Sequence, residues 1–298
     1  MKASKKALNI GGAILILSVL AILWILSILF WRPPKIRGAY GASIREHGFC
    51  IIPTVFTVSE CKTIEKQASA NKMHELMRAF FGREGKAAHA IREKIMDTDG
   101  AYTFHNYIWN IRKGSVVTCH SDNNARRFNP GQKHPSYTVL IYPTGGCLGV
   151  VPRSHFMRQW FYLYNPIVDI VCNPGDIIVF DAELIHVGGT SCREKENPRI
   201  QLKFSHKDDM KVLGYYQEYY KIIDKKNKIP AFISNAQKNM SCMAPIISDL
   251  TQSENIKTAR GSVEGAKIGW GQRLFSLFFY GDSEYYDLSL HRTDRYIM

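Results

Sequence analysis

The chain is 298 residues long, and beyond an apolar amino-terminal segment it has room for one sizeable domain. Its formal net charge is +13, yet no run of Lys and Arg with interleaved aromatic residues indicates a nucleic-acid groove, so no specific nucleic acid is expected as a partner. The seven Cys residues are odd in number and unpatterned, which argues against a disulfide scaffold and leaves one or two bridges open.

The amino-terminal segment predicts a membrane anchor. Residues 1–9 form a basic tail, and residues 10–31 contain no charged residue and are rich in Leu and Ile. A helix over residues 10–31 would be about 33 Å long, which matches the apolar core of a bilayer. A cleavable signal peptide would have a shorter apolar region and a small-residue cleavage site, whereas Trp31 is followed by Arg-Pro-Pro. Basic residues flank both ends, so we expect a single-pass membrane protein whose side of the membrane is undetermined.

The rest of the chain is expected to form a linker at 32–43, a folded domain at 44–233 and a carboxyl-terminal extension at 234–298. Thr57 and Glu60 have the spacing of a capping box, which predicts a helix that runs to about residue 71. The other elements predicted early in the domain are an edge strand at 48–53, a helical region at 72–97 broken by Gly82 and Gly85, and strands at 101–110 and 137–142.

A set of two His and one Asp predicts a metal site. In a strand, side chains two residues apart point to the same side, so a strand over residues 115–120 can direct His120 and, just past its end, Asp122 into one pocket. His186 follows a turn and a buried strand within residues 171–180 and supplies the third ligand. Two imidazoles and one carboxylate can occupy one face of an Fe(II) octahedron and leave the opposite positions open.

The strand predicted at 197–205 adds a basic residue. It alternates so that Arg199, Gln201, Lys203 and Ser205 share one face, and three apolar residues share the other. If this strand is a neighbour of the segment that carries His186, Arg199 can point into the same pocket. A guanidinium there would bind the distal carboxylate of a dicarboxylate through two parallel hydrogen bonds.

With these residues in place, residues 47–206 resemble the Fe(II)/2-oxoglutarate-dependent oxygenase superfamily. The matching stretches are 110–114 before His120-Ser-Asp122, the Gly-Asp strand 175–180 before His186, and Arg199. The Gly-Asp strand is similar to that of prolyl 4-hydroxylases, whereas residues 145–155 resemble phytanoyl-CoA hydroxylases, so the subfamily stays open. The resemblance implies a mainly β fold with flanking helices (α+β), built on a double-stranded β-helix (jelly-roll) core, beside the one amino-terminal transmembrane helix.

The resemblance also implies roles for single residues. His120, Asp122 and His186 would hold Fe(2+), and Arg199 would anchor 2-oxoglutarate, although a position thirteen residues after His186 is slightly far along the chain for the family. Further candidates lie on the predicted strands and in the loop at 123–135. Tyr107, Asn110 and Tyr137 are candidate partners of 2-oxoglutarate, with core packing as the alternative for Tyr; Arg126 and Arg127 either meet an anionic substrate group or are exposed loop residues; His134 and His155 are expected to be structural or surface residues.

The function expected from this reading is a membrane-anchored dioxygenase. It would use O2 and 2-oxoglutarate, with ascorbate as a possible reductant, to hydroxylate a protein side chain or a lipid-like small molecule with release of succinate and CO2. Two alternatives stay open: a non-catalytic jelly-roll binding module, and a nucleic-acid demethylase of the same superfamily. The complete His, Asp, His and Arg set favours catalysis, and the membrane anchor argues against the demethylase.

The last third of the chain is less informative. Residues 215–223 predict a helix with a tyrosine-rich face, and residues 234–268 lack periodicity and predict a long mobile loop. Residues 269–280 are apolar but too short to span a bilayer. We expect them to cap the core, with docking at a membrane surface as the alternative.

Overall fold

The computed structural model describes residues 2–39, 41–70, 72–82, 85–113, 118–188, 199–213, 219–249, 269–286 and 290–292. The predictions made for residues 115–117, 197–198, 215–218 and 250–268 lie outside the described residues.

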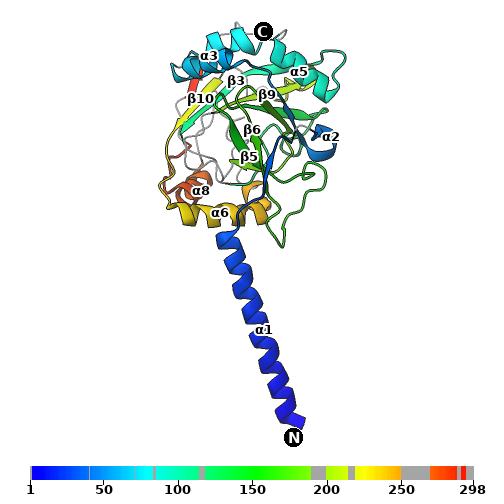
Figure 1. Ribbon diagram of the computed structural model, residues 1–298, viewed down its shortest axis with the longest axis vertical. Helices are drawn as coiled ribbons and strands as arrows, with labels where there is room; N and C mark the ends of the chain where they lie inside the picture. The colour runs from blue at the N-terminus through cyan, green and yellow to red at the C-terminus, as the bar shows by residue number, and fades with distance from the viewer. Residues whose placement is uncertain are drawn as a thin grey trace.

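Helix α1 (Lys2–Phe30) projects from one end of the domain and has no other element beside most of its length (Figure 1). Its segment Gly12–Phe30 has a mean hydropathy of 3.0 and no buried residue. By length and composition, α1 can cross a membrane. The chain continues into strand β1 (Lys35–Arg37), which pairs in parallel with β6 at the edge of a sheet.

Over the residues that the structure describes, two β-sheets form the domain. The four-stranded sheet has the order β1-β6-β5-β8, and the seven-stranded sheet has the order β11-β10-β3-β9-β4-β7-β2. Their remaining strands are β2 (Phe49–Ile52), β3 (Tyr102–Lys113), β4 (Ser136–Ile141), β5 (Gly146–Val150), β6 (Val168–Cys172), β7 (Ile177–Asp181), β8 (His186–Gly188), β9 (Arg199–His206), β10 (Tyr219–Asp224) and β11 (Leu290–Arg292). A buried cluster joins the two sheets face to face, with Leu140 and Phe180 from one and Leu148 and Ile170 from the other. These mixed sheets with flanking helices agree with the expected mainly β, α+β class.

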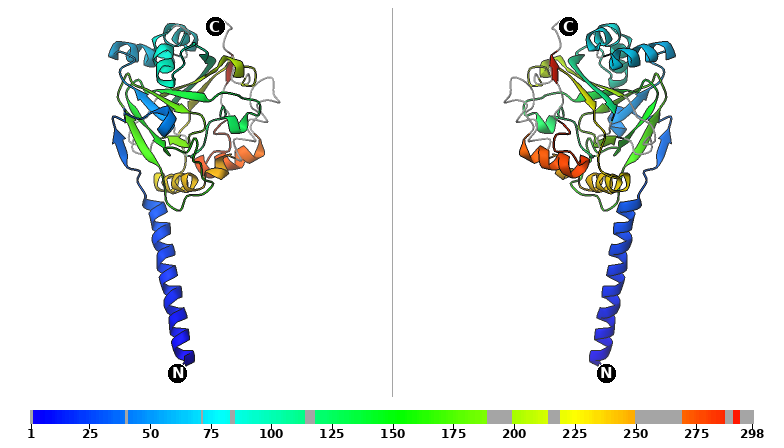
Figure 2. Two further views of the ribbon diagram at one scale, coloured as in Figure 1. Left: turned by 90° about the vertical axis from the view of Figure 1, so that its right-hand side faces the viewer. Right: turned by 90° about the vertical axis from the view of Figure 1, so that its left-hand side faces the viewer.

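In the described part of the chain, four helices pack around one edge and the outer face of the larger sheet. They are α2 (Ile44–His47), α3 (Val58–Ser69), α4 (Met73–Phe80) and α5 (Lys86–Ile95). Three of them lie at the far end of the domain from α1, and α2 lies at the side of the domain, next to β2 (Figures 1 and 2). The predicted capping box at the start of α3 is confirmed, because Thr57 Oγ1 accepts from the Glu60 amide while Glu60 accepts from the Thr57 amide. A second buried cluster joins α3 and α5 to β9 through Ile64, Ile91 and Leu202.

The turn before β7 explains the Gly-Asp pair of the sequence. Gly175 has φ +90°, and a Cβ atom there would lie 2.2 Å from the carbonyl oxygen of Phe56, so only glycine fits. Asp176 fixes the same turn, because its carboxylate accepts from the amides of Thr54 and Asn173 at 3.0 and 2.9 Å. The turn therefore fixes where β7 begins. It thereby also fixes the start of the segment that leads from β7 to His186.

Two predictions for the last third are wrong. Residues 219–223 are not helical but belong to β10, which pairs in parallel with β3, because aromatic and β-branched residues suit a pleated surface. Residues 234–249 are not a loop: α6 (Ala231–Met243) is a helix, and residues 245–249 are also helical. Helix α8 (Trp270–Tyr280) buries Phe279 and Tyr280 against β3 and β10, so the expectation that this segment caps the core holds for one of its faces.

Candidate metal centre

Three donor atoms converge where the two sheets meet. The Nε2 atoms of His120 and His186 lie 3.8 and 3.7 Å from Oδ1 of Asp122, and all three side chains are buried. Donor atoms about 2.1 Å from one ion stand roughly 3.0 Å apart at right angles and roughly 3.4 Å apart in a tetrahedron. Each Nε2 atom therefore needs to approach Oδ1 by less than about 1 Å for the imidazole and the carboxylate to share one metal ion. All three donor atoms lie within 4.8 Å of one another, so the group could hold such an ion.

The backbone fixes both imidazoles in the orientation that a metal needs. His120 and His186 face each other across an antiparallel bridge, in which each amide donates to the other's carbonyl at 3.0 and 2.9 Å. Their Nδ1 atoms lie 2.8 Å from the carbonyl oxygen of Thr118 and 3.0 Å from that of Leu184. Because a carbonyl only accepts, Nδ1 carries the proton and Nε2 presents its lone pair to the centre.

Asp122 is held so that only one of its oxygens faces the imidazoles. Its Oδ2 accepts from Lys203 Nζ at 2.7 Å and from the Thr138 hydroxyl, and Lys203 also donates to that hydroxyl at 2.9 Å. Burial by itself would raise the pKa of Asp122, but the charge of Lys203 and the two imidazoles hold this pKa well below its usual range. Asp122 is therefore a carboxylate over the physiological pH range, as a metal ligand must be.

Burial also keeps both imidazoles neutral. It lowers the pKa of His186 to about 3, and it lowers the pKa of His120 although the Asp122 carboxylate acts in the opposite direction. Two neutral imidazoles and one carboxylate have the protonation states in which all three bind a cation.

The alternation predicted for β9 is confirmed, and it brings Arg199 to the face that carries the centre. Ile200, Leu202 and Phe204 belong to the cluster under the helices, whereas Lys203 contacts Asp122 on the other side. Arg199 has the same parity as Lys203, so it lies on the side of the centre, and it is buried. Among the described residues, no carboxylate lies within ion-pair distance of its guanidinium.

The structure does not bring Asn110 and Tyr137 to this face, which corrects two predicted partners of 2-oxoglutarate. Asn110 lies opposite Ile200 on the helix-covered face of the sheet and donates to the carbonyl of Ala68 at 2.8 Å. Tyr137 lies in the cluster under the helices, next to Tyr102. Successive residues of a strand point to opposite faces, so choosing a residue one position away from the right one selects the wrong face.

Tyr107 differs from these two residues. Its ring packs on Leu213, in a small cluster apart from the core beneath the helices. The pairing of β3 with β9 shifts its register between Phe104 and Ile108. Tyr107 lies in this irregular stretch, so simple alternation along β3 does not show whether it shares a face of the sheet with Lys203.

The two loop arginines have different surroundings. Arg127 pairs with Glu183 and lies 3.7 Å from Asp249, so it belongs to an ion-pair network rather than facing an empty pocket. Arg126 is exposed. Arg158, which the sequence did not single out, joins the same network through Asp249 and donates to the hydroxyl of Ser121, between two of the three converging residues, at 2.7 Å.

Sequence reasoning missed Lys203 and Thr138 as the residues that hold Asp122. The alternation of β9 had placed Lys203 on the right face, but nothing in the strand itself indicates Asp122 as its partner. Thr138 left no signal of its own, because Thr is common in strands for packing reasons alone. Only the pairing of β4 with β9, in which Thr138 lies opposite Lys203, makes the contact predictable.

A second group of possible ligands lies at the surface. His134 stacks on His206 with ring centroids 3.7 Å apart, and Asp208 is within 3.8 Å of both residues. Nearly parallel rings direct their lone pairs along parallel lines rather than to one point, and Nδ1 of His206 already accepts from the Asp208 amide. The expected structural role of His134 fits this arrangement better than a metal site. His155 packs against Gly48 and lies 3.2 Å from the carbonyl oxygen of Arg45, which is also structural.

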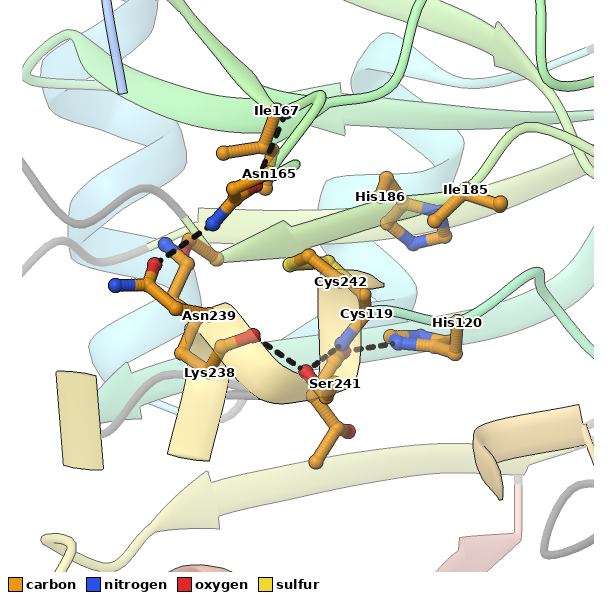
Figure 3. Close-up of a disulfide and its surroundings, with 12 residues drawn as sticks. Cys119, His120, Asn165, Ile167, Ile185, His186, Lys238, Asn239, Ser241 and Cys242 are labelled. Carbon is orange, nitrogen blue, oxygen red and sulfur yellow. Dashed lines mark hydrogen bonds between the residues drawn. A yellow bond between two sulfur atoms is a disulfide. The ribbon is translucent and has the colours of Figure 1, made fainter. Parts of the chain in front are cut away.

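A tether joins the centre to the carboxyl-terminal part of the chain. Cys242 of α6 forms a disulfide with Cys119, the residue before His120, and Ser241 accepts from the Cys119 amide at 2.9 Å (Figure 3). Cys147 is also disulfide-bonded, so the two bridges left open by the sequence are accounted for. Asn239, in the Asn-Met-Ser sequon, is buried and bonded to Asn165, so it is not available for glycosylation in the folded protein.

Similarity to known proteins is found in structure and not in sequence. No family profile matches the sequence, and no curated protein matches it. The structure is similar to that of SnoN, a non-haem 2-oxoglutarate-dependent epimerase of nogalamycin biosynthesis, with 14% identity and a TM-score of 0.43 over 56% of this chain and 79% of that one. For EvdO2 of Micromonospora carbonacea, solved with 2-oxoglutarate, the identity is 13%, the TM-score 0.40 and the coverage 57% and 89%. For iron-bound HygX of Streptomyces hygroscopicus, these values are 14%, 0.36, 58% and 88%. The descriptions of these three proteins name a 2-oxoglutarate-dependent epimerase, a complex with 2-oxoglutarate and an iron-bound protein.

Proposed function

We propose that the chain is an Fe(II)- and 2-oxoglutarate-dependent oxygenase whose iron is held by His120, Asp122 and His186. The observation that carries this proposal is the convergence of two neutral Nε2 atoms and one carboxylate oxygen at a single buried point. Three protein ligands that occupy one face of an octahedron are typical of the 2-His-1-carboxylate sites of non-haem iron oxygenases.

The path of the chain supports a jelly roll as the core. Starting from β3 in the larger sheet, the chain reaches His120, which is bridged to β8 of the smaller sheet, and then returns to β4. It crosses again to β5 and β6, back to β7, over to β8 and back to β9. This alternation between two facing sheets is how a double-stranded β-helix is built, and the three proposed iron ligands lie at its crossings.

Arg199 is the proposed anchor of 2-oxoglutarate. It lies four residues before Lys203 on the same face of β9, so the two side chains start about 13 Å apart. A five-carbon dicarboxylate bound at the centre and the long Arg side chain together can bridge this gap. A buried guanidinium needs a carboxylate partner, and the distal carboxylate of 2-oxoglutarate supplies one.

Bound iron, with 2-oxoglutarate and O2, would supply the oxidising power and yield succinate and CO2. The protein residues would position and insulate this chemistry. The carbonyls of Thr118 and Leu184 keep the imidazoles in one tautomer, and Lys203 with Thr138 keeps Oδ2 of Asp122 away from the centre. The expected substrate is a protein side chain or a lipid-like small molecule, and ascorbate is the expected reductant.

The proposal also includes the side of the membrane on which the domain lies. The proposed role of the apolar span of α1 is a single membrane anchor. The disulfides at Cys119 and Cys147 favour the oxidising side of the membrane for the domain, since disulfides persist in secretory compartments and outside cells. Removing residues 1–36 should release the protein from membranes. In sealed vesicles, the domain should resist an added protease until detergent is present if it lies in the lumen.

One titration tests the enzymatic proposal. Under anaerobic conditions, Fe(II) and 2-oxoglutarate added to the purified full chain should give a weak visible charge-transfer band, and air should then produce succinate. His186→Ala and Asp122→Ala should lose the band. Tyr137→Phe, on the opposite face of the sheet, is the matched control and should keep it. A band of full intensity in both triad variants would refute the site.

The same measurement distinguishes the proposed oxygenase from the two alternative functions. A non-catalytic jelly-roll module would bind the metal or 2-oxoglutarate without forming succinate in air, with or without lysate proteins and lipids as substrates. A nucleic-acid demethylase would form succinate only when methylated nucleic acid is added.

A further inference from the structure

The end of the domain next to α1 is covered by exposed apolar side chains. They come from three segments, the loop 156–164, α6 and α8, and the largest are Phe156, Met157, Trp160, Phe161, Leu163, Tyr164, Phe232, Met240, Trp270, Leu274, Leu277 and Phe278. Figures 1 and 2 show α6 and α8 lying across the end of the domain from which α1 emerges, with the loop reaching down past α6. An exposed apolar surface of this extent indicates an interaction site.

Helix α8 is inside out for a helix that packs on a water-soluble core. Its exposed stripe is Trp270, Leu274, Leu277 and Phe278, at the spacing of one helix face. The opposite face buries Gln272 and Ser276, which hydrogen-bond each other at 3.1 Å, beside Phe279 and Tyr280. A helix between core and water would place its polar residues outside, so the outer environment of α8 is more apolar than water.

Helix α6 shows the same inversion. Its buried side includes Gln237, Lys238 and Asn239, each held by a carbonyl acceptor of the chain: Gln237 by Phe278, Lys238 by Gly188 and Asn239 by Ile28. Its exposed residues include Phe232 and Met240. The polar groups thus tie α6 to its neighbours, and the apolar groups remain outside.

Contacts with α1 show what lies outside. The Asn239 amide donates to the carbonyls of Ile28 and Trp31, so α6 is attached to the carboxyl end of the apolar span. The Trp24 indole donates to the carbonyl of Leu163 at 3.1 Å. Trp24 lies seven residues before Trp31, about 10 Å further along the helix. The tip of the loop, where Leu163 is 88% exposed, therefore lies beside the part of α1 that an apolar bilayer core would surround.

The composition of the surface fits lipid. The loop 156–164, α6 and α8 contain no Asp or Glu, so no carboxylate of these segments opposes anionic headgroups. Trp160, Tyr164 and Trp270 are the residue types that collect at membrane interfaces. If α1 spans a bilayer, it holds this surface at the level of the membrane. A second copy or a soluble partner could then reach the surface only alongside the bilayer.

We propose that the loop 156–164, α6 and α8 form a membrane-docking surface that sits in the bilayer interface and holds the metal centre against the membrane. This proposal rests on the membrane anchoring by α1 proposed above. The docking elements contact the two residues that flank His120. Cys242 of α6 is bonded to Cys119 (Figure 3), and Arg158 of the loop donates to Ser121. A substrate dissolved in the bilayer would then reach the centre without crossing much water.

The test uses the full chain in phosphatidylcholine nanodiscs without added iron. A nitroxide label is placed through Leu163→Cys, Leu277→Cys, Leu20→Cys or Val58→Cys in separate variants. Leu20 lies within the span of α1, whereas Val58 is an equally apolar, 68% exposed residue of α3, at the far end of the domain. Collisions with oxygen, which concentrates in lipid, are compared with collisions with a nickel chelate, which stays in water. Retained metal binding in each variant checks its fold.

Labels at Leu163 and Leu277 should resemble the one at Leu20, with oxygen favoured over the chelate by several-fold, and the label at Val58 should show the reverse. If Leu163 and Leu277 resemble Val58 while Leu20 reports lipid, the anchor stands and the docking proposal is refuted. An aqueous signal at Leu20 would instead refute the anchor. Shielding of Leu163 and Leu277 from both quenchers, with two chains per disc, would assign the surface to a second copy and also refute docking on lipid.

A substitution sharpens the result. In the Leu163→Cys background, Leu274→Glu with Phe278→Glu puts two charges on the exposed stripe of α8 and should shift the label towards the aqueous chelate. Val58→Glu is the matched control and should leave the label unchanged. No shift from the α8 pair would show that α8 is not part of the docking surface.

Discussion

The two faces of β9 share one backbone and one sheet but differ in how they are stabilised. On one face, Ile200, Leu202 and Phe204 contribute to an apolar cluster under the helices, where shape and volume decide the energy. On the other face, Lys203 is charged, fully buried and held by Asp122 and Thr138. The apolar face can change in small steps, whereas the polar face depends on each partner being present.

The largest effect is expected from Lys203→Met. Removing one member of a buried ion pair leaves Asp122 without its counter-charge, and this should lower the free energy of unfolding of the metal-free protein by about 3–5 kcal/mol. A divalent cation supplies positive charge at the same carboxylate, so added metal should stabilise this variant more than it stabilises the wild type. Denaturant unfolding with and without metal measures both increments.

Leu202→Ala is the control on the opposite face. It should lower the free energy of unfolding by about 2–5 kcal/mol through a cavity, and the increment from metal should equal that of the wild type. Equal increments in Lys203→Met and Leu202→Ala would show that Lys203 and the metal centre are not coupled.

Arg199→Ala tests whether the polar face also binds the cosubstrate. Loss of a charge-assisted pair should weaken 2-oxoglutarate binding by about 1.5–3 kcal/mol, which is roughly ten- to a hundredfold in Kd, with iron binding retained. Calorimetry with Fe(II) or an inert metal present measures the affinity, and Ile200→Val on the other face is the matched control. Unchanged affinity in Arg199→Ala would move the anchor to another basic residue.

The buried side chain of His105, on β3, makes the stability of the protein depend on pH. Burial, with the charge of Lys203, lowers the pKa of this fully buried side chain to about 3. In the unfolded chain His has a pKa of about 6.5, so between these values the unfolded state binds the extra proton. The contribution to stability is therefore complete above pH 6.5 and is lost as the pH falls towards 3.

The expected loss from His105 between pH 6.5 and 5 is about 2 kcal/mol in the metal-free protein. His105→Gln should remove this part of the slope. The difference between the two proteins removes the contributions of other titrating groups to the slope. One of these groups is Asp181, whose pKa burial raises to about 6 and whose contribution to the slope has the opposite sign. Identical slopes for wild type and variant would contradict the assignment.

The smallest effect compares neighbours on β4. Thr138→Val removes a hydroxyl that donates to Asp122, and it should cost about 1–2 kcal/mol and weaken metal binding. Val139→Thr places a hydroxyl in the apolar cluster and should cost about 1–3 kcal/mol while leaving the metal affinity unchanged. A change of metal affinity in Val139→Thr of the size seen in Thr138→Val would remove the distinction between the faces.

Local patterns in the sequence were sufficient for several features. The uncharged run at 10–31 predicted α1, because length and composition alone decide whether a helix can cross a bilayer. Thr57 and Glu60 predicted the start of α3, since a capping box lies within one turn. The spacing of His120 and Asp122, and the alternation of β9, placed side chains on one side of a short segment, and the structure keeps that arrangement.

Other features depended on which segments meet in space. Asn110 and Tyr137 lie on the wrong face because the register of β3 and β4 against β9, rather than either strand alone, decides which residues look towards the centre. The contact of Lys203 with Asp122 joins residues 81 positions apart, and no local pattern encodes it. Helices α6 and α8 were hard to interpret from sequence because their apolar sides face outward. The burial of α6 is decided by α1 and by the disulfide of Cys242 with Cys119, and that of α8 by β3, β10 and α6. These segments become neighbours only in the folded protein.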